Sequence, residues 1–133
     1  MGAEMTVDHF QPRLHAGDDS LDNLVYCCHA CNEFKGDYWQ TSPELRLLHP
    51  LQDNLFFHYR EQEDGTLLAL TGRGTNHLQT LHLNRPELIA FRLEQKEIVF
   101  LRQRNQMLHQ LLEDAKQTTR QLEEELERNM REN

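Results

Sequence analysis

The chain has 133 residues, of which 38% are hydrophobic, and it carries a formal net charge of −8 at pH 7. This length permits one small domain with an extension and excludes two large domains. The charge excludes an extensively basic surface, which proteins use to bind nucleic acid through its phosphates. Any basic stripe must therefore be local, and its candidate members are Arg13, Lys35, Arg46 and Arg73.

The chain contains three cysteines, no secretory signal peptide and no apolar run long enough to span a bilayer. These features predict reduced thiols and a cytoplasmic protein without a membrane partner. We do not expect a disulfide framework.

The N-terminal third of the chain predicts the order strand, turn, strand, helix. Met5–Val7 has strand character, and Gly17–Ser20 is a cluster of turn-forming residues. Leu24–Cys27 predicts a second strand, and Cys31–Trp39 predicts a short helix. Together these segments form a β-β-α pattern.

Four polar residues on this segment have a characteristic spacing. Asp8 and His9 are adjacent, Asn23 follows His9 by fourteen positions, and Asn32 follows Asn23 by nine. With Pro12 three positions after the histidine, this order resembles the HNH, or ββα-metal, endonucleases. The resemblance implies a ββα-metal fold and metal-dependent hydrolysis of DNA phosphodiester bonds.

The resemblance also implies a role for each residue. Asp8 and Asn32 would supply oxygen ligands to Mg²⁺ or another divalent cation. His9 would be the general base that deprotonates the attacking water, a task that suits a neutral imidazole. Asn23 would brace the loop and orient His9. Lys35, one helical turn beyond Asn32, would contact a phosphate.

The resemblance continues beyond this motif, over roughly residues 5–92, to one bacterial HNH subfamily. Its members carry a hairpin and a helix after the nuclease motif. The segments that carry this resemblance are Leu47–Gln52, Phe57–Tyr59, Glu63–Thr66, Leu70–Gly74 and Leu83–Pro86.

Many HNH proteins of this kind hold a structural zinc ion with two Cys-x-x-Cys pairs. Cys28-x-x-Cys31 corresponds to the second pair, and no cysteine precedes Met5, through a truncated N-terminus, a misassigned start or real loss. Because structural zinc requires four ligands, we expect either a partial zinc site or two reduced, half-buried thiols. The side chains available to complete a zinc site are Cys27, His15, His29 and His49.

The middle of the chain predicts a hairpin and a short helix. Phe56–Gln62 and Thr66–Leu70 would be the strands of the hairpin, joined by the strong turn pair Asp64-Gly65. Gly72–Gly74 predicts a connecting loop, and Asn76–Leu83 predicts the helix.

A long helix is predicted from Asn84 to about Met130, because no Pro or Gly interrupts this segment after Pro86. Asn84 would be its N-cap. The helix carries an apolar stripe that is too long to bury on so small a domain, so we expect either a coiled coil with a partner or a second copy, or a solvated tail. The stripe is interrupted near its seam by Arg104, Thr118 and Glu125.

The orientation of such a pair is constrained by charge. Parallel chains would bring the acidic runs Glu123–Glu127 together, which favours an antiparallel arrangement or a helix that folds back.

We therefore predict an α+β protein: an HNH ββα-metal module over residues 1–42, a hairpin and short helix over 43–83, and a long helix over 84–133. The predicted function is a metal-dependent HNH endonuclease acting on DNA. The alternative is a catalytically weak or inactive HNH-like scaffold whose long helix mediates assembly. The acidic balance of residues 1–90, with six basic and thirteen acidic residues, favours weak binding of free DNA or a partner that delivers it.

Overall fold

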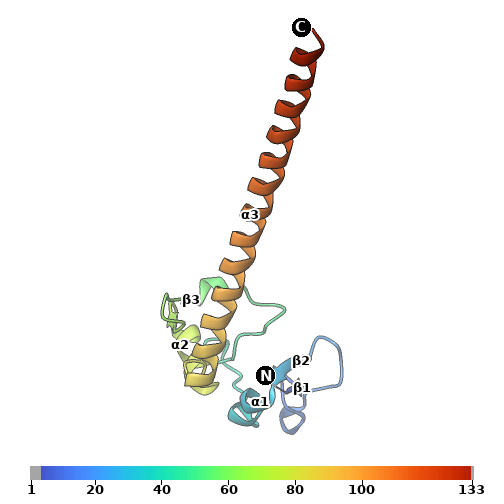
Figure 1. Cartoon of the computed structure of the whole chain (residues 1–133). Coiled ribbons are helices and arrows are strands. Elements are labelled where there is room, and N and C mark those ends of the chain that lie inside the picture. Colours follow the sequence, from blue (N-terminus) through green and yellow to red (C-terminus); the bar gives the residue numbers. More distant parts are fainter. Residues whose placement is uncertain (1–3, 133) are drawn as a thin grey trace. The chain divides into compact units, whose positions relative to one another are not determined.

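The computed structural model describes residues 4–132 and divides the chain into two units, Met1–Phe91 and Arg92–Asn133. Figure 1 labels the main elements along the chain. They are, in order, β1 (Met5–His9), η1 (Arg13–His15), β2 (Leu24–Cys28), α1 (His29–Lys35), η2 (Leu55–Phe57), β3 (Tyr59–Glu61), β4 (Leu67–Ala69), α2 (Gly72–Thr80) and α3 (Pro86–Arg131). Small strands combined with helices confirm the predicted α+β class.

The β-β-α order predicted for the N-terminal segment is confirmed. β1 and β2 are antiparallel, with Asp8 opposite Val25 and His9 opposite Leu24, and α1 follows β2 directly. The predicted helix bounds Cys31–Trp39 are wrong, because α1 ends at Lys35. Gly36 takes a φ of 49° at the C-cap, a conformation that costs glycine little, and its N–H bonds to the Asn32 carbonyl.

The predicted hairpin is present, but its strands are shorter than predicted. β3 and β4 pair in an antiparallel manner, with Tyr59 opposite Ala69 and Glu61 opposite Leu67. The residues expected to begin the first strand form η2 instead, because the side chain of Asn54 accepts a hydrogen bond from the Phe56 N–H and starts a helical turn.

The prediction of a loop at Gly72–Gly74 is wrong, since these residues form the first turn of α2. The hydroxyl oxygen of Thr71 caps this helix by accepting a hydrogen bond from the Gly74 N–H at 3.0 Å. A Cβ atom at Gly74 would lie 2.2 Å from the His58 carbonyl oxygen. This glycine is therefore needed for close packing of the helix start against the hairpin.

The core of the first unit is small. Its buried apolar side chains are Pro12, Val25, Leu47, Leu48 and Leu78, and its buried polar side chains are Lys35, His49 and His77. The side chains of Arg73 and Asp53 are joined by two hydrogen bonds, each 2.9 Å long, and this pair braces the core region. Such two-point pairing fixes both side chains in one orientation.

The long helix is confirmed as α3, but the N-cap predicted at Asn84 is wrong. The side chain of Asn84 is used elsewhere, since it exchanges two hydrogen bonds with the backbone of Leu67. The carbonyl of Arg85 accepts the first helical bonds, from Leu88 and Ile89. Across residues 4–132, no helix combines the length and apolar character needed to cross a membrane.

Candidate active site and the cysteine pair

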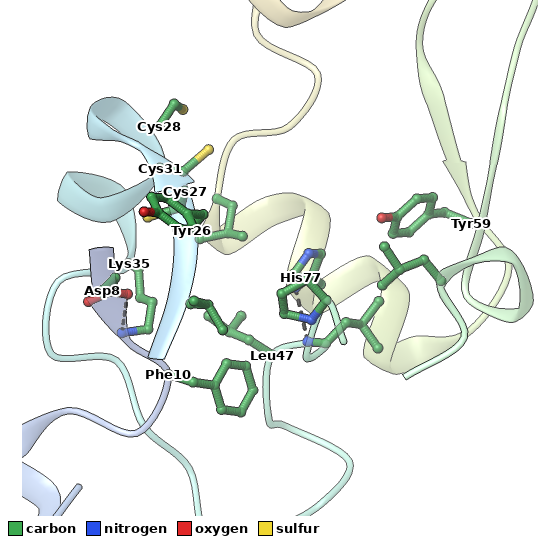
Figure 2. Close-up of a pocket in the computed structure, with 15 residues that line it drawn as sticks. Asp8, Phe10, Tyr26, Cys27, Cys28, Cys31, Lys35, Leu47, Tyr59 and His77 are labelled. Carbon is green, nitrogen blue, oxygen red and sulfur yellow. Dashed lines mark hydrogen bonds and ion pairs between the residues drawn. The ribbon is translucent and has the colours of Figure 1, made fainter. Parts of the chain in front are cut away.

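The carboxylate of Asp8 lies against an ammonium group inside the module. Lys35 Nζ is 2.8 Å from Asp8 Oδ2, and the two side chains are 6% and 13% exposed. Lys35 also donates a hydrogen bond of 2.7 Å to the His9 carbonyl oxygen. Figure 2 shows this pair at the end of β1, with Lys35 reaching across from α1. A phosphate contact by Lys35 would require its ammonium group to leave both partners.

His9 lies beside Asp8 in sequence, but its imidazole bonds to a different carboxylate. His9 Nε2 is 2.7 Å from Asp19 Oδ1, and the His9 side chain is 26% exposed. Arg13 holds the same carboxylate through contacts of 2.6 and 2.7 Å from its NH2 group. The hydrogen bonds from Arg13 and then from His9 hold the pKa of Asp19 below its usual value, so this carboxylate is ionised at neutral pH.

An ionised carboxylate accepts hydrogen bonds and donates none, which fixes the tautomer of His9. The proton of the neutral ring lies on Nε2, facing Asp19, and the lone pair lies on Nδ1. Arg13 Nε is also directed at Nε2, but at 3.4 Å. The closer carboxylate of Asp19 therefore determines which ring nitrogen carries the proton. The geometry leaves one ring nitrogen of His9 available to accept a proton.

Asn23 closes the loop that connects β1 to β2. Its amide group donates to the carbonyls of Gln11 and Asp18 at 3.0 and 2.8 Å, and its oxygen accepts from the Gln11 N–H at 2.7 Å. Gly17 lies inside the same loop, where a Cβ atom would be 1.7 Å from the Gln11 carbonyl oxygen. Asn23 therefore braces the backbone around His9, whereas Asp19 contacts the imidazole itself.

Asn32 lies on α1, one turn before Lys35, and is half-buried. Its carbonyl accepts the N–H of Gly36, and no hydrogen bond involves its side-chain amide among the described residues. Asp8 Oδ2 is buried and accepts no hydrogen bond there, although the charge of Lys35 is close. A buried carboxylate oxygen that already attracts a cation suits a hard divalent ion that keeps water ligands.

The cysteine pair has an arginine as its partner. The NH2 group of Arg85 donates to Cys28 Sγ at 3.3 Å and to Cys31 Sγ at 3.4 Å. The same guanidinium lies 5.5 Å from the centre of the Phe34 ring, and Phe34 packs on His82 with ring centres 4.4 Å apart. Arg85 therefore links α1 to the segment between α2 and α3.

The thiols of this pair differ in acidity. Burial raises the pKa of both, but at Cys28 the N–H and thiol of Cys31 and the charge of Arg85 outweigh burial and lower the pKa. At Cys31 burial prevails and raises the pKa. Burial also raises the pKa of Cys27, to about 11. Cys28 is thus the most acidic of these thiols.

The donor set does not fit a four-ligand structural zinc site. No group of three or more His, Cys, Asp and Glu side chains within residues 4–132 is arranged to hold a metal ion. His49 is buried and bonds to the Asp22 carbonyl at 2.9 Å, and His29 pairs with Glu33. The contribution to zinc binding considered for His15, His29, His49 and Cys27 is therefore not found, and a cation, Arg85, faces the sulfur atoms.

An apolar cavity of about 250 Å³ lies behind the Asp8–Lys35 pair. Figure 2 shows it between β2, the segment at Leu47 and α2, with His77 and Tyr59 on its far side. His77 is buried, and its Nδ1 accepts the N–H of Leu48 at 3.0 Å. Burial lowers the pKa of His77 to about 4. The histidine is a packing residue.

The residues considered for a basic stripe have internal partners. Arg13 pairs with Asp19, Lys35 with Asp8, and Arg73 with Asp53. Arg46 lies over the Trp39 ring at 5.2 Å from its centre and donates to the carbonyls of Gln40 and Thr41. These cations are used to hold the fold together.

Sequence reasoning missed two residues of this region, Asp19 and Arg85. Asp19 stands in a cluster of turn-forming residues, and nothing in its local pattern distinguishes it from Asp18. Arg85 is 54 positions from Cys31, so their contact depends on the packing of α1 against the segment between α2 and α3 within the first unit. The Leu83–Pro86 segment, which contains Arg85, carries part of the family resemblance, but its sequence pattern does not indicate that Arg85 contacts the cysteines.

One comparison with known proteins, a match to a family model, agrees with this geometry. Residues 2–37 match a family model described as HNH endonuclease. No curated protein and no solved structure matches the chain. The match ends before the segments that resemble one bacterial subfamily, so that finer assignment stays a prediction. Asp8 and His9 at the end of β1, and Asn23 bracing the loop to β2, thus lie in the segment, residues 2–37, that is similar to the HNH endonuclease family.

Proposed function

We propose that the HNH domain hydrolyses DNA phosphodiester bonds, with His9 as the general base and a divalent cation held by Asp8 and Asn32. The observation that carries this proposal is the contact between His9 Nε2 and the carboxylate of Asp19. His9 Nε2 is bonded to the ionised Asp19 at 2.7 Å, which leaves Nδ1 as a proton acceptor at the end of β1. The family match of residues 2–37 supports the same class of chemistry.

The chain's own residues would act in a defined order. His9 takes a proton from water, and the hydroxide attacks phosphorus while the bond to the leaving oxygen breaks. Asp19 stabilises the imidazolium that forms, because it is ionised and in contact with the ring. Asn23 keeps the loop backbone in place during this step. When bound, the divalent cation supplies charge stabilisation for the leaving oxygen.

The metal would be held by few protein ligands. Asp8 and Asn32 supply two oxygen atoms, and Mg²⁺ characteristically binds one or two protein carboxylates with water and substrate phosphate. Lys35 now neutralises Asp8. Metal binding would therefore compete with this ammonium group, and the cation and Lys35 together would offset the acidic character of residues 1–90.

A second candidate function is an HNH-like scaffold with little catalysis. It is favoured by one observation: Arg13, Lys35 and Arg73 are each engaged with a carboxylate inside the first unit. Basic groups used in this way contribute less to binding phosphates. Under this alternative, α3 mediates assembly with a second copy or another protein.

A plasmid-nicking assay with Mg²⁺ or Mn²⁺ separates the two functions. We expect the parent chain to cleave, and His9→Ala to lose ~10²–10⁴ in rate, which is typical for loss of a general base. His15→Ala is the matched control, because His15 is a neighbouring exposed histidine on η1. Cleavage by His9→Ala at the parent rate, with a contaminant excluded, would remove His9 from the mechanism.

Calorimetric titration tests the metal ligands separately from activity. Asp8→Ala and Asn32→Ala should weaken binding of Mn²⁺, because each removes an oxygen ligand. Asn23→Ala should lower the cleavage rate and keep metal affinity, since Asn23 contacts only loop backbone in its described hydrogen bonds. Unchanged Mn²⁺ affinity in both variants would exclude Asp8 and Asn32 as metal ligands.

We also propose a reducing compartment such as the cytoplasm. The support is chemical: Cys27, Cys28 and Cys31 are all free thiols. Alkylation of the protein in freshly opened cells, followed by peptide mapping, should find all three thiols modified.

A further inference from the structure

The second unit is one continuous helix, and most of its apolar side chains are exposed. Leu101, Leu108, Leu112, Leu122 and Leu126 are between 44% and 63% exposed. α3 runs through this unit without a break (Figure 1). Exposed apolar side chains on this scale mark a surface that another molecule covers.

These side chains follow a heptad repeat of the coiled-coil type. With Ile98 at position a, the a positions are Ile98, Asn105, Leu112, Thr119 and Leu126. The d positions between them are Leu101, Leu108, Ala115 and Leu122. The pattern is sustained over about four heptads, the length that indicates a coiled coil. The residues that seemed to interrupt the stripe, Arg104, Thr118 and Glu125, all fall at g, beside the seam.

We propose that residues 98–126 pair with a second copy of this chain as a parallel, in-register, two-stranded coiled coil. Asn105 decides the orientation. Its side chain has no hydrogen-bonding partner in the described residues, and a polar Asn at one a position is a known specifier of register and oligomeric state. In a parallel pair the two Asn105 side chains meet and can bond to each other.

An antiparallel pair would treat Asn105 differently. Antiparallel packing places each a residue opposite a d residue, and every d residue from Leu101 to Leu122 is apolar. Asn105 would then be buried against Leu or Ala without a polar partner, which is costly. The amide therefore selects the parallel arrangement.

Thr119, the other polar residue at the seam, is compatible with burial. Its hydroxyl donates to the Ala115 carbonyl of its own helix at 3.0 Å. Its hydrogen-bonding capacity is thus used within the helix, and its methyl group can face the second copy. No unsatisfied hydroxyl group would result at this layer.

The charges that flank the seam are also compatible with a parallel pair. Glu97 at g would face Arg102 at e of the second copy, an attractive pair that occurs twice by symmetry. The acidic run, which argued against parallel chains, is spread over positions e, f, g and b. Glu123 would face Thr118, and Glu125 would face Met130, so no direct like-charge pair arises.

The ion pairs formed by Lys116 and Arg131 lie outside the seam. Lys116 pairs with Glu113 at 2.8 Å, and these residues occupy e and b. Arg131 pairs with Glu127 at 3.6 Å, at f and b. A second copy can therefore dock without breaking either ion pair.

Disulfide trapping in the full-length chain tests the orientation. Asn129→Cys places a thiol at d, and Arg128→Cys places one at c, facing away from the seam. In a glutathione redox buffer we expect an interchain disulfide between introduced thiols for Asn129→Cys only, identified by peptide mapping because the native cysteines are also present. In an antiparallel pair centred on this segment the introduced thiols would be about 50 Å apart. A dimer without this link, or equal linkage in both variants, would overturn the proposal.

Analytical ultracentrifugation tests the interface itself. The parent chain should be a dimer, and Leu108→Ala should raise its dissociation constant at least about tenfold. Gln110→Ala, at the outward position f, is the matched control and should leave the constant unchanged. A monomeric parent, or equal constants for all three chains, would exclude this interface.

A third variant isolates the role of Asn105. Asn105→Leu should tighten association and yield a mixture of oligomers or orientations, because the specifying amide is lost. Gln103→Leu, at f, should remain a single dimeric species. A uniform parallel dimer in Asn105→Leu would show that Asn105 does not set the orientation. These outcomes are independent of nuclease activity, so they distinguish this proposal from the proposed function.

Discussion

Lys35 Nζ and Asp8 Oδ2 are 2.8 Å apart, in a location where both side chains are almost excluded from solvent. The pair joins α1 to β1, and Lys35 extends the link by bonding to the His9 carbonyl. The same two residues thus couple the stability of the module to its proposed chemistry. An ammonium group occupies the charge position that a divalent cation would take beside Asp8.

Lys35→Met should destabilise the first unit by about 3 kcal/mol, because it leaves a buried carboxylate without its counter-charge. Chemical denaturation followed by circular dichroism measures this change. The double variant Asp8→Asn with Lys35→Met should be less destabilised than Lys35→Met alone, since no uncompensated charge remains. A double variant as unstable as the sum of the two singles would contradict this coupling.

Asp19→Asn should slow DNA cleavage about tenfold or more, because the amide cannot stabilise the imidazolium of His9 as a carboxylate does. The pH profile of cleavage should shift at the same time, which a purely structural effect would not produce. Asp18→Asn is the control, because Asp18 bonds to Ser20 and has no described bond to His9. Equal rates and profiles for the two variants would exclude Asp19 from the site.

Arg85→Ala should lower the free energy of unfolding by about 1 kcal/mol, through loss of its contacts to the cysteine sulfurs and to the Phe34 ring. Arg85→Lys should recover only part of this, because an ammonium group cannot contact both sulfurs and the ring in the same planar geometry. Denaturant titration of the parent, Arg85→Ala and Arg85→Lys measures their order of stability. Full recovery of the unfolding free energy in Arg85→Lys would show that only the positive charge at this position matters.

Zinc content provides a separate measurement on the cysteine pair. Because the structure offers two sulfur ligands and a cation, we expect the purified chain to contain well below one equivalent of zinc, with a melting temperature insensitive to a chelator. Elemental analysis and thermal unfolding with and without the chelator check both statements. One full equivalent of zinc, with unfolding on chelation, would show that Arg85 yields to metal.

Lowering the pH should destabilise the first unit through His77. Burial lowers its pKa from 6.5 to about 4, so its neutral form favours the folded state. The contribution is complete above pH 6.5 and is lost as the pH falls toward 4, by at most about 3 kcal/mol. His77→Gln retains an acceptor for the Leu48 N–H without a titrating ring. Its unfolding free energy should be flatter over this range, and a slope equal to the parent's would exclude His77 as the cause.

Local patterns in the sequence predicted the elements whose causes are local. The β-β-α order, the hairpin at Asp64-Gly65 and the long helix all follow from alternation, turn residues and uninterrupted periodicity. Some errors arose from local caps, at Asn54 and Thr71, and one arose where a distant group decides. Asn84 is not a cap because the backbone of Leu67 uses its amide, whereas the helix at Gly72–Gly74 follows from the Thr71 cap.

The same distinction applies to the candidate site. The motif residues Asp8, His9 and Asn23 were identifiable because their spacing is itself the signal. The partners of that motif were not, because Asp19 contacts His9 through the shape of a loop, and Arg85 reaches Cys28 from 57 positions away. The positions of such partners depend on packing, which no short window of sequence contains.

The segment that matches the HNH family is shorter than the first compact unit of the chain. Of the buried apolar side chains in the described part of the chain, Pro12 and Val25 fall within residues 2–37, whereas Leu47, Leu48 and Leu78 do not. Transplanting the motif alone into another protein would leave its strands without an interior. Recombination between proteins would therefore have to carry a block reaching at least to the end of the first unit at Phe91 for the transferred nuclease motif to keep its shape.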